Sequence, residues 1–334
     1  MTQTTVLVTG GAGYIGSHAV LALHDAGWRV VVIDDLSNGR REAIPDGVPF
    51  LQANIGDRSA VEPFLREHDV GAVMHFAGSI VVPESVENPH LYYGNNTVAT
   101  HALIGAALAC RVRHILFSST AAVYGAPERV PIAEDEPTKP INPYGSSKLM
   151  TETMLRDCAA AYPFNYGALR YFNVAGADRE GRSGQASKGA THLIKVACEA
   201  AIGKRTHVDV FGTDYATPDG TCIRDYIHVS DLADAHVAAL EKLIADPGES
   251  FTLNCGYGRG FSVLEVLDTL DKVNGSAIER RMGPRRAGDP PQLVAANQRL
   301  VERLGWRPKR DDLDGIVRDA LNWERKLAAE RAAG

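Results

Sequence analysis

Short apolar runs alternate with helical patterns through the first half of the chain. Six β-rich runs cover residues 5–9, 29–33, 48–53, 72–76, 114–118 and 165–170. Between them, residues 14–26, 58–68 and 96–111 carry apolar positions at helical spacing. Repeated strand–helix alternation predicts a parallel sheet with helices on both faces, wound by right-handed crossovers into a doubly wound, Rossmann-type α/β fold.

The alternation ends after Gly176. Residues 177–189 are polar and rich in glycine and serine, which predicts a mobile loop. Further helices and isolated strands are predicted at 192–202, 207–211, 231–245, 250–254 and 263–273, the last opened by a Ser262–Glu265 capping box. We therefore expect a dinucleotide-binding domain over residues 1–176 and a smaller α/β substrate domain over 177–334. The alternative for segments such as 222–245 is that they return to the first domain.

The first run leads directly into the glycine-rich stretch GGAGYIGSH, which begins at Gly10. Gly11, Gly13 and Gly16 fit G-x-G-x-x-G, and Gly10 gives a second spacing with the same partners. Glycines let the backbone approach a ligand, and a helix N-terminus offers free N–H groups to a phosphate. A glycine-rich turn is the alternative, but the strand before and the helix after favour a dinucleotide site.

Asp34 ends the second run, about 20 residues beyond the glycines. A carboxylate there accepts hydrogen bonds from the adenosine ribose hydroxyls and repels a 2′-phosphate, so it favours NAD over NADP. Arg40 and Arg41 follow closely and weaken that preference. The alternative is a turn residue at the strand end, because Asp35 stands beside it.

Candidate site residues follow the carboxyl end of each predicted strand. After the glycines and Asp34 they are Asn54, Ile55, Ala77, Gly78, Ser119, Thr120, Tyr171, Phe172 and Asn173. Ligands of doubly wound sheets bind beyond the carboxyl ends of the strands. Six groups of candidate residues at the same edge of the sheet therefore support a ligand site there more strongly than any single motif does.

Tyr144 and Lys148 are four residues apart in a predicted helix and share one of its faces. A tyrosine with a pKa of about 10 is a poor base at neutral pH. A neighbouring ammonium, or a nicotinamide cation, favours the phenolate and lowers that pKa. Such a pair can take a proton from an alcohol while hydride leaves the same carbon. The Y-x-x-x-K spacing is common on amphipathic helices, but the dinucleotide motif and the hydroxyls of residues 118–120 favour catalysis here.

Composition and charge narrow the class of protein. The 334 residues carry a net charge of −6 and no basic block, so neither nucleic acid nor anionic lipid is an expected partner. We expect no signal peptide and no membrane helix, because a strand begins at once and no apolar run is long enough. Five scattered cysteines predict reduced thiols and a cytoplasmic location. The histidines show no ligand spacing, so we expect no metal.

The assembled motifs resemble the extended short-chain dehydrogenase/reductase family, and within it the UDP-hexose 4-epimerases. The resemblance covers essentially the whole chain and rests on VLVTGGAGYIGSH, IDDLSNG, HFAG, SSTAAVYG, NPYGSSK, LRYFNVAGA, DGTCIRDYIHVSDLADAH and RRAGDPP. It implies tightly bound NAD that is regenerated in each turnover, a UDP-hexose substrate held mainly by the second domain, and a homodimer formed through helices 96–111 and 149–161. The implied reaction interconverts UDP-glucose and UDP-galactose through a 4-keto sugar, within galactose metabolism.

The resemblance also assigns roles by position. Thr120 would bind the sugar O4, Tyr144 would be the acid/base, and Lys148 would bind the nicotinamide ribose and tune Tyr144. The implied cofactor residues are Gly10, Gly13, Tyr14, Ile15, Gly16, Asp34, Asp35, Asn38, Asn54, Ile55, Phe76, Ala77, Gly78, Asn95, Tyr144, Lys148 and Tyr171. The implied substrate residues are Thr120, Tyr144, Asn173, His192, Leu193, Phe211, Arg224, Tyr226, Arg286, Asp289 and Leu293. The two arginines suit a diphosphate, because guanidinium binds phosphate oxygens bidentately.

Three positions depart from the family pattern. Ile80 stands where some members have a lysine that contacts the cofactor, and Asn54 replaces an aspartate near the adenine. Leu293 stands where a tyrosine often closes the sugar pocket. The first two bear on cofactor affinity and the third on substrate range. A 4-epimerase for UDP-N-acetylglucosamine, UDP-xylose or UDP-glucuronate therefore remains an alternative.

Two other functions are weighed against epimerisation. Sugar-nucleotide 4,6-dehydratases need acidic residues just after the threonine, where this chain has Ala121 and Ala122. That difference argues against dehydration and against UDP-glucuronate decarboxylation. A catalytically silent NAD-sensing protein would lose the tyrosine or the lysine of the Y-x-x-x-K pair, and both are present.

Overall fold

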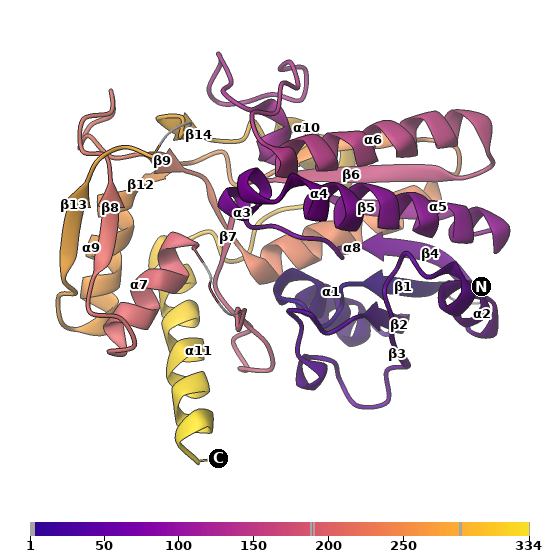
Figure 1. Ribbon diagram of the computed structural model, residues 1–334, viewed down its shortest axis with the longest axis horizontal. Coiled ribbons are helices and arrows are strands. Elements are labelled where there is room, and N and C mark those ends of the chain that lie inside the picture. The colour runs from indigo at the N-terminus through magenta and orange to yellow at the C-terminus, as the bar shows by residue number, and fades with distance from the viewer. Residues whose placement is uncertain (1–3, 188, 190, 287–288, 334) are drawn as a thin grey trace.

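The computed structural model describes residues 4–187, 189, 191–286 and 289–333 (Figure 1). Lys188 of the predicted loop and Ala287 and Gly288 of the RRAGDPP motif lie outside the described residues. The central element is a seven-stranded sheet in the order β11-β6-β5-β4-β1-β2-β3. Its strands are β1 (Thr5–Thr9), β2 (Arg29–Asp34), β3 (Phe50–Gln52), β4 (Val70–His75), β5 (His114–Thr120), β6 (Asn165–Tyr171) and β11 (Phe251–Cys255).

Every neighbouring pair of strands in this sheet is parallel. Successive strands are added on one side of β1 and then on the other, which is the doubly wound order expected from the alternation. The third predicted run is shorter than expected, as only Phe50–Gln52 pairs with β2. The fifth and sixth strands reach further, so Thr120 and Tyr171 lie at their carboxyl ends.

Helices cover both faces of the sheet because alternate side chains of each strand point to opposite sides. Val6 and Val8 pack in one core cluster, while Leu7 packs in another on the other face. The first cluster takes residues from α1 (Tyr14–Asp25), α8 (Val229–Ala245) and α10 (Gln298–Leu304). The second takes residues from α2 (Arg58–Glu67), α5 (Ala99–Ala109) and α6 (Pro143–Ala161).

A smaller unit lies beside the carboxyl edge of the sheet (Figure 1). Its own core joins α7 (Leu193–Ala201), α9 (Val263–Asn274) and α11 (Leu313–Ala333). The capping box predicted for α9 is confirmed, because Ser262 and Glu265 each accept a hydrogen bond from the other's backbone N–H. Its short strands are β8 (Val208–Phe211) with β13 (Arg280–Gly283), and β9 (Ile223–Arg224) between β12 (Phe261–Ser262) and β14 (Gln292–Leu293).

Short elements connect the two units and line the sheet edge. β7 (Asn173–Ala175) pairs in parallel with β10 (Tyr226–His228). The connections around the sheet contain the helices α3 (Val82–Glu87) and α4 (Pro89–Tyr92), the π-helix η2 (Tyr93–Val98), and the 3₁₀ turns η1 (Arg41–Ala43) and η3 (Ala121–Tyr124).

The strand expected at residues 250–254 was placed wrongly among the isolated strands of the smaller unit. Phe251–Cys255 pairs with β6 and forms the edge of the large sheet. The α8 helix also returns to this sheet and packs against α1, as allowed for segment 222–245. A short apolar run shows that a strand forms, but it does not identify the distant strand with which it pairs.

The segment predicted as a mobile loop is fastened at several points. Ala177 and Gly184 form a β-bridge. The Ser183 hydroxyl lies 2.6 Å from the Ser17 hydroxyl of α1, and both residues are buried. Arg182 forms an ion pair of 2.9 Å with Asp25 at the end of α1. The described part of the loop is therefore built into the structure by polar contacts that its composition does not reveal.

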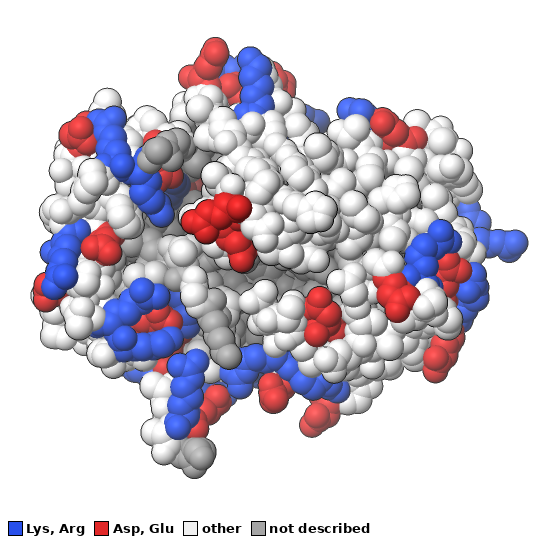
Figure 2. All heavy atoms as spheres, viewed as in Figure 1, with Lys and Arg blue, Asp and Glu red and all other residues white. Residues whose placement is uncertain are grey.

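Charge is mixed over the surface. Figure 2 shows acidic and basic side chains interspersed on one face, with a hollow where the two units meet. Across the described ranges, no helix has the length and apolar character needed to cross a membrane. The same residues contain no group of three or more His, Cys, Asp or Glu side chains that could hold a metal ion.

Candidate active site

The glycine-rich turn between β1 and α1 leaves no room for side chains. Gly10 has a φ of +68°, and a Cβ there would lie 2.6 Å from the backbone nitrogen of Ala77. A Cβ on Gly16 would lie 2.1 Å from the carbonyl oxygen of Gly10. No side chain caps the N-terminus of α1, so the N–H groups of its first turn, from Tyr14 onward, lack intrahelical acceptors. This bare backbone surface fits the diphosphate of a dinucleotide such as NAD.

Asp34 lies against the glycine turn. Its Oδ2 accepts a hydrogen bond of 2.9 Å from the Ala12 N–H, and its Oδ1 accepts one of 2.8 Å from the Leu36 N–H. Burial raises the pKa of Asp34, and these backbone hydrogen bonds oppose the rise. Each carboxylate oxygen has a second lone pair, so Asp34 can still accept a ribose hydroxyl.

The two arginines behind Asp34 already have partners. Arg40 forms ion pairs with Glu42 at 3.7 Å and with Glu330 at 3.8 Å. The Arg41 guanidinium lies 5.0 Å from the centre of the Phe50 ring. Both arginines are thus engaged elsewhere, which supports the preference for NAD over NADP.

The other predicted cofactor residues differ in which of their groups are accessible to a ligand. Asp35 and Asn38 are exposed, while the Ile55 side chain is buried in the core and leaves only its backbone for a ligand. Asn54 accepts a hydrogen bond from the Gly56 N–H at 2.8 Å. Ile80, at a position where some relatives have lysine, is exposed.

The loop after β4 approaches the predicted catalytic lysine. Gly78 has a φ of +153°, and a Cβ there would lie 3.9 Å from the Lys148 Nζ atom. Phe76 packs against the ring of His236, with 4.8 Å between ring centres. Asn95 donates a hydrogen bond of 3.0 Å to the Ser79 hydroxyl. The predicted cofactor loop and the predicted catalytic helix are therefore neighbours.

Tyr144 and Lys148 enter the site from the first turns of α6. The Asn142 side chain caps this helix by accepting a hydrogen bond of 2.9 Å from the Gly145 N–H. Lys148 is buried and donates a hydrogen bond of 3.1 Å to the Ser118 carbonyl of β5. Thr120 ends the same strand, so three predicted catalytic side chains meet at its carboxyl end.

The acid/base balance of Tyr144 differs from the sequence-based expectation. Burial raises the pKa of Tyr144, and a hydrogen bond from Thr120 acts in the opposite direction. Burial also lowers the pKa of Lys148 to about 8, while the charge of Glu152 opposes that change. In the protein alone burial therefore sets the direction of the Tyr144 pKa shift, while the lowering expected from a bound nicotinamide cation stays a prediction.

Tyr171 ends β6 beside these groups. Its hydroxyl accepts a hydrogen bond of 3.0 Å from the Ser118 hydroxyl, and burial raises its pKa. Its neighbour Phe172 packs against the apolar residues that follow Thr120. The ends of β5 and β6 thus supply adjoining parts of the same site.

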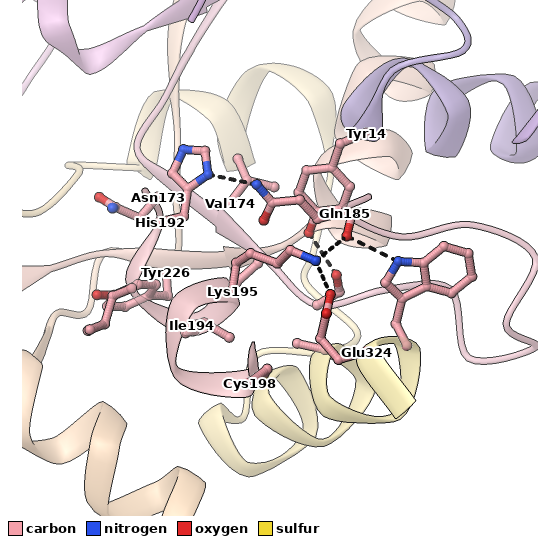
Figure 3. A pocket seen from close by; sticks show the side chains of 15 residues that line it. Tyr14, Asn173, Val174, Gln185, His192, Ile194, Lys195, Cys198, Tyr226 and Glu324 are labelled. Atoms are coloured by element: carbon pink, nitrogen blue, oxygen red, sulfur yellow. Dashed lines mark hydrogen bonds and ion pairs between the residues drawn. The ribbon is translucent and has the colours of Figure 1, made fainter. Parts of the chain in front are cut away.

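Several predicted substrate residues gather around a small cavity between α7 and the sheet edge (Figure 3). Its lining includes Tyr14, Asn173, His192, Leu193 and Tyr226. The cavity measures about 20 Å³, which is room for about one water molecule. Tyr14, predicted at the cofactor, donates its hydroxyl hydrogen to the Gly176 carbonyl at 2.7 Å.

Sequence reasoning missed a group of buried polar residues that also line this cavity. The side-chain amide nitrogen of Gln185 lies 2.9 Å from Nδ1 of the His192 ring, and the Gln185 backbone carbonyl accepts a hydrogen bond of 3.0 Å from Lys195 (Figure 3). Lys195 also pairs with Glu324 of α11. A lysine at a buried position of the amphipathic helix α7 was the one local signal of this group.

The residues predicted to hold the diphosphate form a chain of ion pairs. Asp289 lies 3.3 Å from Arg224 and 3.0 Å from Arg286. The Arg286 guanidinium lies 4.8 Å from the centre of the Phe211 ring. Arg285, next to Arg286, pairs with Asp214 at 2.7 Å. A pocket open to solvent is lined by Asp214, Tyr215, Ala216, Arg285, Arg286, Asp289 and Pro291.

Leu293 lies on β14, in the small sheet of β12, β9 and β14. It is partly buried and packs against the cluster of Ala121, Val123, Tyr124 and Ile132 that follows Thr120. Its carbonyl accepts a hydrogen bond of 3.0 Å from the Asp225 N–H. Leu293 therefore belongs to the apolar surroundings of the predicted sugar site.

Comparison with known proteins gives consistent matches. The model of the NAD dependent epimerase/dehydratase family matches residues 6–256. A UDP-glucose 4-epimerase of Azospirillum brasilense is 63% identical over 96% of this chain and 92% of its own. One from Rhizobium meliloti is 46% identical over 97% and 98% of the two chains.

Solved structures agree with these relatives. The UDP-glucose 4-epimerase of Brucella ovis in complex with NAD superposes with a TM-score of 0.93 and 45% identity, over 96% of this chain and 98% of the other. The enzyme of Bifidobacterium longum in complex with NAD+ and UDP gives a TM-score of 0.92 and 38% identity, over 97% and 99%.

Proposed function

We propose a function for this protein from the premise that the chain belongs to the NAD dependent epimerase/dehydratase family. Its reaction is the reversible epimerisation of UDP-glucose and UDP-galactose at C4. One observation carries the proposal: Tyr144, Lys148 and Thr120 meet at the carboxyl end of β5, beside the loop after β4. Family membership alone leaves several reactions open, and this arrangement selects proton transfer at an alcohol.

Tyr144, Thr120 and Lys148 each have a distinct role in the proposed reaction. When bound, NAD supplies a hydride acceptor beside C4 and a positive ring that favours the Tyr144 phenolate. Tyr144 takes the proton from O4 and later returns it to the same oxygen. Thr120 holds O4 next to Tyr144 through its hydroxyl. Lys148 places a positive charge next to the site, and its hydrogen bond to the Ser118 carbonyl fixes its position.

The substrate must be held firmly at one end and loosely at the other, because inversion at C4 requires the 4-keto sugar to present its opposite face. Arg224 and Arg286 offer paired donors to the diphosphate, and the Phe211 ring lies beside Arg286. Asp289 forms ion pairs with both guanidinium groups, and it would share them with the phosphates of a bound substrate. Apolar surfaces at Ala121 and Leu293 offer the sugar few directional contacts.

The direct test is turnover of UDP-galactose by the purified protein. We expect formation of UDP-glucose until the two sugars reach equilibrium. An enzyme that instead released a 4-keto-6-deoxy sugar would be a dehydratase, and a protein with bound NAD but no product would be a sensor. An epimerase for UDP-N-acetylglucosamine, UDP-xylose or UDP-glucuronate would convert those sugars in preference to UDP-galactose.

A second expectation is that the purified protein already contains NAD and is active without added cofactor. The reaction is redox-neutral, and the glycine turn and Asp34 give NAD a fitted site. The absorbance spectrum of the supernatant after denaturation would identify the dinucleotide. A cofactor-free protein that becomes active only with NADP would contradict both the retention of NAD and the role of Asp34.

We further propose a homodimer formed through α5 and α6. Val98, directly before α5, and Met150 of α6 are 65% and 44% exposed. The Thr97 hydroxyl contacts the Met150 sulfur at 3.9 Å, so the segment that carries Val98 packs beside α6. Light scattering should give twice the mass of the 35.9 kDa chain, and Val98→Asp with Met150→Glu should give the single mass. A wild-type protein of single-chain mass would contradict the dimer.

The proposed cellular location is the cytoplasm. All five cysteines are free thiols, and three of them are buried. Reduced, unpaired cysteines are typical of a reducing compartment.

A further inference from the structure

A buried ion pair lies one helical turn beyond the Tyr144–Lys148 pair. Glu152 follows Lys148 by four residues on α6, so the two side chains share the face of the helix that meets the sheet. Its carboxylate contacts Arg170 of β6 twice, with Oε1 at 2.9 Å from Nε and Oε2 at 2.6 Å from Nη2. The side chains of Glu152 and Arg170 are only 7% and 8% exposed.

The same carboxylate is joined to the strand that carries Thr120. Glu152 Oε1 accepts a hydrogen bond of 2.5 Å from the Ser119 hydroxyl of β5. Lys148 donates to the carbonyl of the preceding residue, Ser118. One carboxylate therefore connects the helix of Tyr144 and Lys148 with the strand of Thr120 and with β6.

Arg170 is itself held from the far side. Its Nη1 donates a hydrogen bond of 2.9 Å to the Tyr124 hydroxyl, which donates in turn to Asn254 of β11 at 2.7 Å. Burial acts to lower the pKa of Arg170, but the hydrogen bonds and charge of Glu152 outweigh it and raise that pKa. Arg170 is thus a permanent cation and Glu152 its fixed partner.

We infer that Glu152 is a positioning residue for the reaction, which keeps Lys148 in its ammonium form while fixing α6 against the ends of β5 and β6. This inference rests on the proposed function, because it assigns the ammonium of Lys148 a part in turnover. A burial-lowered lysine needs a nearby negative charge if it is to stay protonated at working pH. Glu152 supplies that charge, and Arg170 and Ser119 hold it in place.

The charged and titratable groups around Lys148 come from three elements. They are Tyr144 and Glu152 on α6, His75 on β4, and Arg170 and Tyr171 on β6. Burial, with a contribution from the charge of Lys148, lowers the pKa of His75 to about 3, so His75 stays neutral. Burial raises the pKa of Tyr144 and of Tyr171. Lys148, with its pKa lowered to about 8, is thus the group that titrates near neutral pH.

The test is the variant Glu152→Gln, which keeps an oxygen for the Ser119 hydroxyl and removes the charge. Loss of the carboxylate leaves Lys148 easier to deprotonate, so the alkaline limb of the kcat profile should move to lower pH. The expected shift is on the order of one pH unit, the low end of what a nearby opposite charge contributes. The 15N signal of Lys148 Nζ, assigned with Lys148→Met, should show the same shift in the purified holoenzyme without turnover.

Glu152→Gln leaves Arg170 buried without a partner and is expected to lower the melting temperature. The double variant Glu152→Gln with Arg170→Gln buries no unpaired charge. Because it also removes the Arg170 cation, its Lys148 midpoint should lie between those of Glu152→Gln and the wild type. Asp157→Asn is the matched control, because it removes a carboxylate from an exposed position of the same helix and should leave the midpoint unchanged.

The two failures can be told apart. Folded variants whose alkaline limb and Lys148 signal stay at the wild-type pH would overturn the inference and leave Glu152 as a structural brace alone. A wild-type protein without epimerase activity would instead remove the proposed function. The shift of the Lys148 signal in the variants would still be measurable in that case.

Discussion

Replacing Tyr144 with phenylalanine is expected to lower kcat for UDP-galactose by roughly 10²–10⁴, the range typical of a positioned proton-transfer group. The substitution removes only the hydroxyl that exchanges a proton with O4. The ring should keep its place, because it packs edge-to-face against Tyr92 with 6.5 Å between ring centres. The melting temperature and the NAD content released on denaturation should therefore stay close to those of the wild type.

Tyr92→Phe provides a matched control for this experiment. It removes a phenolic hydroxyl from the ring that touches Tyr144, but that hydroxyl bonds to the Val81 carbonyl and Glu84 and lies outside the proposed chemistry. We expect Tyr92→Phe to retain most of kcat, with some loss of stability. Near-wild-type turnover by purified Tyr144→Phe would remove Tyr144 from the mechanism.

The doubly wound sheet could be predicted because its signals are local. In β1, Val6 and Val8 face one core and Leu7 the other, and each short run of this kind reads as a buried strand. The partner of β11 could not be predicted in the same way. Phe251 pairs with Gly167, more than 80 positions earlier, and nothing within a five-residue apolar run indicates that partner.

The cofactor half of the site is also local in sequence. The glycine turn and Asp34 lie within one strand–helix–strand unit, where spacing reports the geometry directly. The interactions that set the charge state of the catalytic pair are not local. Arg170 reaches Glu152 from a different strand, and the burial of Tyr144 follows from how α6 packs on the sheet. This is why Tyr144 itself could be singled out from the sequence, whereas the burial that raises its pKa in the protein alone could not.

Hidden polar groups follow the same rule. The segment at 177–189 was predicted to be a mobile loop because it is polar and rich in glycine and serine, yet Gln185 and Ser183 are buried by contacts to α7, α11 and α1. Such contacts join residues far apart in the chain. The amino-acid composition of a segment indicates its conformational freedom, but its tertiary contacts depend on the fold of the whole chain.

The second large effect concerns the sugar pocket. Substitutions at Leu293 are expected to change the discrimination between UDP-N-acetylglucosamine and UDP-galactose by roughly 10–200-fold in kcat/KM, the range of a methylene-scale steric change. Leu293 is partly buried and packs against the apolar cluster that follows Thr120. An N-acetyl group at C2 needs volume that a tyrosine at this position would fill and that leucine leaves partly free. We therefore expect the wild type to prefer UDP-glucose and UDP-galactose and to turn over UDP-N-acetylglucosamine weakly.

Two substitutions at this one position test the steric argument in opposite directions. Leu293→Tyr should abolish turnover of the N-acetyl sugar and leave UDP-galactose nearly unchanged, because the ring fills only the space beyond C2. Leu293→Ser should raise turnover of the N-acetyl sugar by adding room. Leucine offers no hydrogen bond to the acetamide, so this gain should come from the added volume. Steady-state kcat/KM for both sugars, measured on both variants, gives the answer. If each variant changes the two sugars by the same factor, Leu293 only packs beneath its strand and does not border the sugar. Opposite changes in the ratio for the two variants are what a wall of the pocket requires.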